Sequence, residues 1–205
     1  MLPMIGPVRV KPPKEKGDWR VKEVVVTKER ADFDNFRNTL NGASYLRVTP
    51  GKYVVLTCQG EVIMSNTDME RRTHYAFVDK AAGNVLINGL GLGMALHAAL
   101  LKDTVKHVTV IEKSPDVLAM IAPDFIGERV TFIEADAFAF QPPKGVRYGA
   151  VWHDIWPTVS EDNLPEMHKL VRKYARRAAW QGCWARPQCE RAREMEGLGE
   201  QNPRR

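Results

Sequence analysis

The chain has 205 residues, of which 44% are hydrophobic and 27% are charged, and its formal net charge is +5. These values are typical of a soluble globular protein with room for one domain of ordinary size and a small appendage. No apolar run approaches the roughly 18–20 residues that are needed to cross a bilayer. Residues 1–20 are rich in Pro and Lys and lack the apolar region of a signal peptide. We therefore expect a cytoplasmic protein with no membrane contact.

The positive charge is concentrated near the C-terminal end. From Arg172 onward there are nine Lys or Arg and four Glu, so this stretch holds the whole net charge of the chain. A basic stretch of this kind can attract nucleic acid. A solvated terminus explains it equally simply, and we favour that interpretation.

The three cysteines are Cys58, Cys183 and Cys189. No neighbouring pair of Cys or His completes a zinc-binding pattern. The sequence therefore predicts reduced structural thiols and no metal site.

The first 82 residues predict a flexible basic arm over 1–20 and a β and helical extension over 21–82. The arm is suggested by its prolines and lysines. In the extension, alternating apolar residues and turn signals predict strands, and a 3.6-residue period predicts helices. The expected elements are a strand at 21–27, a helix at 32–40 that ends at Asn41-Gly42, strands at 45–48, 53–57 and 61–64, and a helix at 68–78.

From residue 83 the pattern changes to alternating strands and helices, which predicts a parallel sheet covered on both faces. The expected strands lie at 85–87, 108–111, 130–133, 150–152 and 178–184, with helices after each of the first, second and fourth strands. We assign this α/β domain to 83–187. Residues 188–205 are polar, have almost no apolar periodicity and predict a disordered tail.

A glycine-rich turn follows the first of these strands. Residues 85–93 read Val-Leu-Ile-Asn-Gly-Leu-Gly-Leu-Gly, which is a strand, a glycine turn and the start of a helix. Glycines permit tight backbone dihedrals and let a ligand approach the main chain. The helix that follows offers free N–H groups to that ligand.

Acidic residues end the next three strands. Glu112 follows the second strand and can accept both ribose hydroxyls of a nucleoside, and Asp136 follows the third strand and can accept the exocyclic amine of an adenine. Asp154 ends the fourth strand beside the topological switch point. This series predicts a Rossmann-like nucleotide site. NAD is disfavoured because Met94 or Leu96 stands where its fingerprint requires a small residue.

At this point the sequence resembles the class I methyltransferases that use S-adenosylmethionine (SAM), and most closely their spermidine synthase-like branch. The resemblance covers residues 53–174 and rests on the hairpin and linker at 52–70, on Ile-Glu-Ala-Asp-Ala-Phe at 133–138 and on Tyr-Gly-Ala-Val-Trp-His-Asp at 148–154. It implies SAM as the cofactor and a catalytic role for Asp154. The residues that we predict to contact SAM are Gly89, Leu90, Gly91, Gly93, Glu112, Lys113, Asp136, Ala137 and Asp154.

The sequence departs from the spermidine synthase pattern at two acids and in its length. Leu92 and Pro157 stand where that branch carries aspartates. A propylamine donor and a polyamine acceptor are cations, and burying them requires carboxylates. Aminopropyl transfer is therefore disfavoured relative to methyl transfer. The chain also ends soon after its fifth strand, so the usual last two strands are missing, and a homodimer partner is one way to complete the sheet.

Residues 153–157, His-Asp-Ile-Trp-Pro, form the candidate chemical site. Asp154 and His153 are the candidate catalytic groups, because either can hold or accept a proton. By strand alternation they point to opposite faces, so one of them packs against a helix. Trp156 and His74 are the candidate substrate contacts. The sequence thus predicts a SAM-dependent methyltransferase with an unknown acceptor; the alternatives are an aminopropyltransferase and a SAM-binding or nucleoside-binding protein without catalysis.

Overall fold

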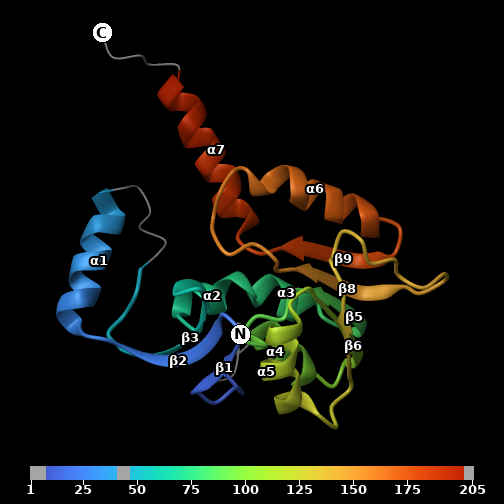
Figure 1. The fold of residues 1–205 in the computed structure, drawn as a ribbon. Coiled ribbons are helices and arrows are strands. Elements are labelled where there is room, and N and C mark those ends of the chain that lie inside the picture. Colours follow the sequence, from blue (N-terminus) through green and yellow to red (C-terminus); the bar gives the residue numbers. More distant parts are fainter. Residues whose placement is uncertain (1–7, 41–46, 201–205) are drawn as a thin grey trace.

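The computed structural model describes residues 8–40 and 47–200, and for 195–200 it describes the backbone alone. Two sheets form the frame of the molecule (Figure 1). The expected helix end at Asn41-Gly42 lies outside the described residues. No helix in the described part of the chain has the length and apolar character needed to span a membrane.

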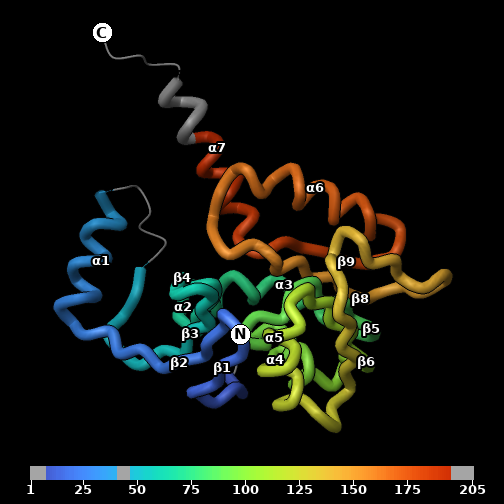
Figure 2. The backbone as a smooth tube through the Cα atoms, in the orientation of Figure 1, coloured from blue at the N-terminus to red at the C-terminus, as the bar shows by residue number. Residues whose placement is uncertain are grey.

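The first sheet is antiparallel, with the order β1-β2-β3-β4, and a helix lies beside it. Its elements are β1 (Lys14–Lys16), β2 (Trp19–Val26), α1 (Lys28–Leu40), β3 (Gly51–Cys58) and β4 (Glu61–Ser65). Strands β2 and β3 pair along their whole length, from Trp19 opposite Cys58 to Val26 opposite Gly51. Helix α1 projects from this sheet (Figure 2), and its Phe33, Phe36 and Leu40 are exposed.

The expectation of a flexible arm over 1–20 is wrong for the residues that the structure describes. Val10 is only 2% exposed and belongs to the main core. The Lys14 ammonium donates to the carbonyl of Met120 at 2.9 Å and forms a 2.6 Å ion pair with Asp124. Strand β1 is therefore fixed to the second half of the chain.

The second sheet confirms the predicted α/β class. Its five strands are all parallel and run in the order β7-β6-β5-β8-β9. The elements from residue 68 are α2 (Asp68–Thr73), α3 (Tyr75–Lys80), β5 (Gly83–Asn88), α4 (Met94–Leu100), β6 (Val105–Glu112), α5 (Pro115–Ile121), the 3₁₀ turn η2 (Ala122–Phe125), β7 (Val130–Glu134), β8 (Tyr148–His153), α6 (Asn163–Tyr174), β9 (Ala178–Cys183) and α7 (Arg186–Glu200). Within the described ranges, β9 is the last strand.

Helices cover both faces of the parallel sheet, as the alternating pattern predicts (Figure 1). Side chains of one parity, such as Ile87 and Trp152, pack with α3, α4 and α5. Side chains of the other parity, such as Leu86 and Val151, pack with Tyr174 of α6. The predicted helix over 68–78 is divided at His74, where the chain turns from α2 into α3.

The expected disordered tail over 188–205 is also wrong for its described part. Helix α7 runs from Arg186 to Glu200. Its first turns are fixed to the core, because Cys189 is fully buried and Ala185, the residue before the helix, is 3% exposed. The amphipathic signal is weak because, among the described side chains of α7, only Cys189 is fully buried.

Candidate functional site

A cavity of about 710 Å³ lies at the carboxyl ends of the parallel strands. The turn after β5, the ends of β6 and β7 and the loop after β8 form its floor, and Leu56, Ile63 and Met64 of the antiparallel sheet form a wall. The predicted residues that line it are Gly89, Gly91, Glu112, Lys113, Asp136, Ala137, Asp154 and Trp156. The topology therefore gathers most of the predicted site in one place, because parallel strands all end at the same edge.

The glycine turn is packed closely against the protein itself. Gly89, Gly91 and Gly93 all have positive φ angles, of 93°, 50° and 71°. A Cβ at Gly89 would collide with the backbone carbonyl of Asp154, and one at Gly91 would collide with the sulfur of Met64. Gly93 faces Phe125 and does not line the cavity. The protein's own packing therefore requires these glycines, independently of any ligand.

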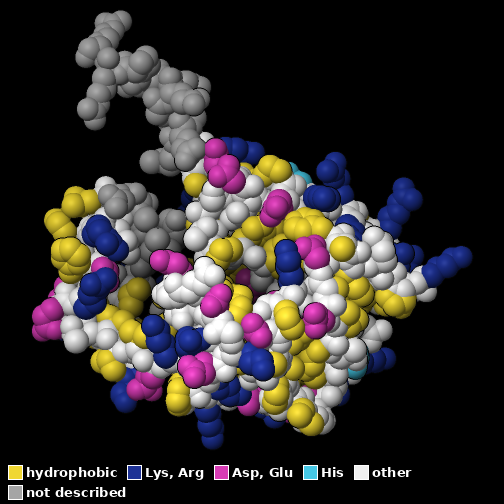
Figure 3. All heavy atoms as spheres, viewed as in Figure 1, with side chains coloured by type: hydrophobic (Ala, Val, Ile, Leu, Met, Phe, Trp, Pro, Cys, Tyr) yellow, Lys and Arg dark blue, Asp and Glu magenta, His cyan; other side chains and the backbone are white. Residues whose placement is uncertain are grey.

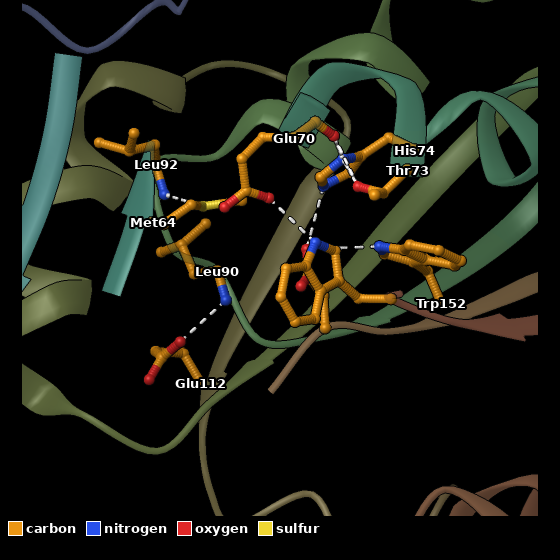
Figure 4. A network of polar contacts seen from close by, with 10 residues as sticks. Met64, Glu70, Thr73, His74, Leu90, Leu92, Glu112 and Trp152 are labelled. Atoms are coloured by element: carbon orange, nitrogen blue, oxygen red, sulfur yellow. Dashed lines mark hydrogen bonds and ion pairs between the residues drawn. The ribbon is translucent and has the colours of Figure 1, made fainter. Parts of the chain in front are cut away.

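Glu112 is held by two backbone N–H groups, of which Figure 4 shows that of Leu90. Its Oε2 accepts from Leu90 and its Oε1 from Ser114, both at 2.8 Å. The Leu90 side chain is buried away from the cavity, so Leu90 contributes to the site through its backbone N–H. That N–H already donates to Glu112. These bonds fix the carboxylate at the cavity wall.

Asp136 is an ionised acceptor at the end of β7. Its Oδ1 accepts from the backbone N–H of Phe138 at 2.7 Å, and Lys113 lies 3.4 Å from its Oδ2. The Phe138 N–H and the Lys113 ammonium hold the pKa of this carboxyl below its ordinary value. The carboxylate thus offers a fixed negative acceptor beside Ala137 at the cavity wall.

Asp154 is positioned by His74 (Figure 4). The Nε2 atom of His74 lies 3.0 Å from Oδ2 of Asp154, and its Nδ1 lies 2.7 Å from the backbone carbonyl of Glu70. Both partners are acceptors, so this geometry favours donation by both ring nitrogens, as in an imidazolium. Burial opposes this charge, but the bond to Asp154 and the charge of Asp154 outweigh it and raise the pKa of His74. The predicted substrate contact of His74 is wrong, because this fully buried ring lies behind Asp154 and outside the cavity.

Glu70 is a cavity carboxylate that the sequence did not single out as a site residue. It lines the cavity and is only 6% exposed. The indole N–H of Trp184 donates to its Oε2 at 2.9 Å. Burial and the nearby charge of Asp154 raise the pKa of Glu70 to about 7, against the opposing charge of His74. The helix breaks at His74, between α2 and α3, and this break gives Glu70 and His74 different surroundings. No periodicity in the sequence reveals the break.

Three carboxylates of the cavity wall each receive an indole N–H. The pairs are Glu70 with Trp184 at 2.9 Å, Glu166 with Trp156 at 2.9 Å and Asp154 with Trp152 at 3.4 Å. Trp156 lines the cavity and is 7% exposed. Indole faces beside carboxylates are a suitable environment for a cation.

His153 lies on the other face of the sheet. It is fully buried, its Nδ1 is 2.8 Å from the side-chain nitrogen of Asn88, and its ring packs on Tyr174 at 5.5 Å. Burial lowers its pKa to about 4, so it is neutral near neutral pH. The prediction of His153 as a catalytic base is wrong, because strand alternation turns it away from the cavity when Asp154 faces it.

Comparisons with known proteins give structural matches only. No protein-family model and no curated protein sequence matches the chain. Similar solved structures include a putative methyltransferase from Escherichia coli, with 18% identity, a TM-score of 0.43 and coverage of 57% of this chain and 64% of that one.

Two further solved structures also match the chain. TrmN from Thermus thermophilus is 17% identical, has a TM-score of 0.45 and is matched over 62% of this chain and 41% of its own length. CalS10, an amino pentose methyltransferase from Micromonospora echinaspora whose structure contains SAM, is 23% identical, has a TM-score of 0.39 and is matched over 59% of this chain and 50% of its own. The chain thus spans less than two thirds of the length of each of these structures.

Proposed function

We propose that the chain binds SAM and transfers the methyl group of SAM to an acceptor in the same cavity. The observation that supports this is the convergence of Glu112, Asp136 and Asp154, from the ends of three strands of one sheet, on one cavity that also contains Gly89 and Gly91. Across the sheet, Asp136, Glu112 and Asp154 follow one another as acceptors for an adenine amine, ribose hydroxyls and a cation, which is the order of these groups in a nucleoside sulfonium.

The residues present fit the nucleoside part of SAM. Each carboxylate oxygen of Glu112 accepts from one backbone N–H. A carboxylate has about four lone-pair sites, so Glu112 can still accept from ribose hydroxyls. The Oδ2 atom of Asp136 remains available to accept from the exocyclic amine of adenine. Among the described residues, Lys113 alone forms an ion pair with it. The volume of about 710 Å³ lies within the range of small-molecule sites, which is roughly 300–1,000 Å³.

SAM, when bound, would supply a methyl group activated by its sulfonium. The chain's own task is then to align the acceptor and take its proton. Asp154 suits this task, because its carboxylate is 11% exposed on the cavity side and His74 holds it from behind. Glu70, with its pKa of about 7, adds a second group that exchanges a proton near neutral pH.

A second candidate, aminopropyl transfer, is favoured by one observation. Leu92 and Pro157 stand where the spermidine synthase-like branch carries two aspartates. Glu70, however, supplies a buried carboxylate at the cavity wall beside Asp154. Leu92 itself is fully buried and its N–H donates to the sulfur of Met64, so its side chain takes no part in the cavity. The free propylamine of such a donor would meet two carboxylates, those of Glu70 and Asp154.

The experiment is a donor comparison followed by a turnover assay. Calorimetry with SAM and with decarboxylated SAM gives the donor, and transfer of a labelled methyl group from SAM to components of a cell extract gives the activity. We expect tighter binding of SAM and label transfer that Asp154→Asn abolishes. Tighter binding of decarboxylated SAM would favour aminopropyl transfer, and SAM binding without turnover would favour a binding protein.

A further inference from the structure

A second hollow, of about 440 Å³, lies at the opposite edge of the parallel sheet from the SAM cavity. It is formed where α6 ends and where the chain enters β8, at the amino ends of β8 and β9. Five of its eight lining residues are cationic and none is acidic; the cations are Arg147, Arg172, Lys173, Arg176 and Arg177. A concave surface of one sign raises the local concentration of anions.

The arginines of this hollow are available to a ligand. Arg147, Arg172 and Arg176 are exposed, and no salt bridge pairs any of the four arginines with an acid in the described part of the chain. Two are oriented by the backbone: Arg147 donates to the carbonyl of Arg176 at 3.2 Å, and Arg177 donates to that of Pro143 at 3.0 Å. Each of these bonds uses one of five guanidinium N–H groups, so the rest can face outward.

Lys173 has a different task. Its ammonium donates to the carbonyls of Ala137 and Phe138 at 3.0 and 2.9 Å, which ties α6 to the loop after β7. Burial lowers the pKa of Lys173, against the charge of Asp136. The ligand-facing charge therefore rests on the arginines.

The cations extend beyond the hollow along α6. Lys169 and Arg172 lie three residues apart in α6 and Arg176 lies two residues past its end, so with the hollow they form one basic stripe. The six helical residues 169–174 span about 9 Å, which equals roughly three nucleotides of a strand at 3.4 Å each. Lys and Arg side chains project from this end of the molecule in Figure 3, beside the loop that precedes β8 in Figure 1. The stripe is longer and more highly charged than one phosphate requires.

We propose that this stripe, defined by Lys169, Arg172, Arg176, Arg177 and Arg147, binds the phosphodiester backbone of a single-stranded nucleic acid. The dipole of α6 alone would explain cations in its last turn. It does not explain Arg147, which approaches from another segment, nor the absence of acids from the lining. The inference does not depend on the SAM proposal, because the hollow and the cavity lie at opposite edges of the sheet.

The test is fluorescence anisotropy of the full chain with a labelled oligouridylate of about a dozen nucleotides, a length within the site sizes of about 4–16 nucleotides known for single-strand binders. Four phosphate contacts predict a salt slope near −3, so affinity should fall about 50-fold between about 50 and 200 mM salt. Arg172→Glu with Arg176→Glu should lower affinity at least tenfold and reduce the slope by about 1.4, because two phosphate contacts are lost. A control with the same charge change, Lys22→Glu with Lys106→Glu on exposed strand positions, should leave both values near those of the unmodified chain.

Three results would overturn the proposal. These are no binding at the lower salt concentration, equal losses in the stripe variant and in the control, and displacement of the oligonucleotide by inorganic phosphate or ATP at equal phosphate concentration. The last result would assign the hollow to a small phosphorylated ligand. Binding that survives in Glu112→Ala would support the separation of the stripe from the SAM cavity.

Discussion

Replacing Glu70 by Gln should stabilise the protein above pH 7 and destabilise it by about 1 kcal/mol below pH 4.5, where only the loss of a hydrogen bond remains. The folded protein raises the pKa of Glu70 from 4.5 to about 7. At about 1.4 kcal/mol per pKa unit, this shift corresponds to roughly 3 kcal/mol of stability lost when the carboxylate ionises in place. The substitution removes that loss, because a neutral amide carries no charge to bury.

The sign follows from proton binding. Between pH 4.5 and about 7 the folded chain holds a proton on Glu70 that the unfolded chain has released, so stability falls as pH rises through this window. The pKa of His74 is also raised, and its contribution falls in the same direction as pH rises. The His74–Asp154 pair is present in both proteins, so the comparison isolates Glu70 to a first approximation.

The expected magnitude is smaller than the full linkage energy. The Gln oxygen can still accept from the indole of Trp184, but the amide loses the bond that the backbone N–H of Ser65 makes to the carboxylate, at a cost of about 1 kcal/mol. A net gain of about 2 kcal/mol corresponds to a rise in Tm of roughly 4–8 °C for a chain of this size.

Thermal unfolding followed by circular dichroism at the two pH values measures the effect. Glu134→Gln, at the exposed end of β7, is the matched control and should change Tm at neither pH. A Glu70→Gln protein whose Tm is equal or lower above pH 7, or whose gain is the same at both pH values, would refute the reasoning. A stabilised variant that also loses activity would show that the carboxylate is kept for the cavity and at the expense of the fold.

Three further predictions concern the cofactor, the base and the C-terminal helix. Glu112→Ala should weaken SAM binding by about 1.5–3 kcal/mol, roughly ten- to a hundredfold, in calorimetry, whereas Glu134→Ala should not; equal affinity would remove Glu112 from the site. Asp154→Asn should lower kcat by about a hundredfold or more, while His153→Gln should change stability and leave the pH profile of kcat as it is, so a profile that moves with His153 would contradict its placement. Cys189→Ser should lower the free energy of unfolding by about 1–3 kcal/mol, and denaturant titration that finds no loss would mean that α7 does not dock on the core.

The sequence predicted the parallel sheet and its acidic edge because those features repeat at short range. Strands of the second sheet read as apolar runs, and an acid lies at or within two residues of the end of three of them: Glu112 in β6, Asp136 after β7 and Asp154 after β8. Parallel topology then brings three separate strand ends to one edge, as the structure confirms.

Features that depend on contacts distant in the chain could not be predicted in this way. Glu70 acquires its raised pKa from burial and from the charge of Asp154, which is 84 positions away, and Trp184, which is 114 positions away, opposes that rise by donating to the carboxylate. A buried carboxylate in a short helix looks like any solvated acid until those partners are placed. His153 and Asp154 are adjacent, and alternation established that they diverge, but only the packing of Tyr174 decides which of them faces the cavity.

The attachment of the first described residues also bears on synthesis of the chain. Arg9 and Lys14 bond to residues 119, 106 and 110 positions later, at Glu128, Met120 and Asp124. At a translation rate of about 5–20 residues per second, those partners emerge roughly 5–20 s after β1 has left the ribosome. The contacts that fix Arg9 and Lys14 therefore form only after α5, η2 and Glu128 have been made. A slow codon tract before residue 120 would lengthen the period in which residues 8–16 are open to chaperones and proteases.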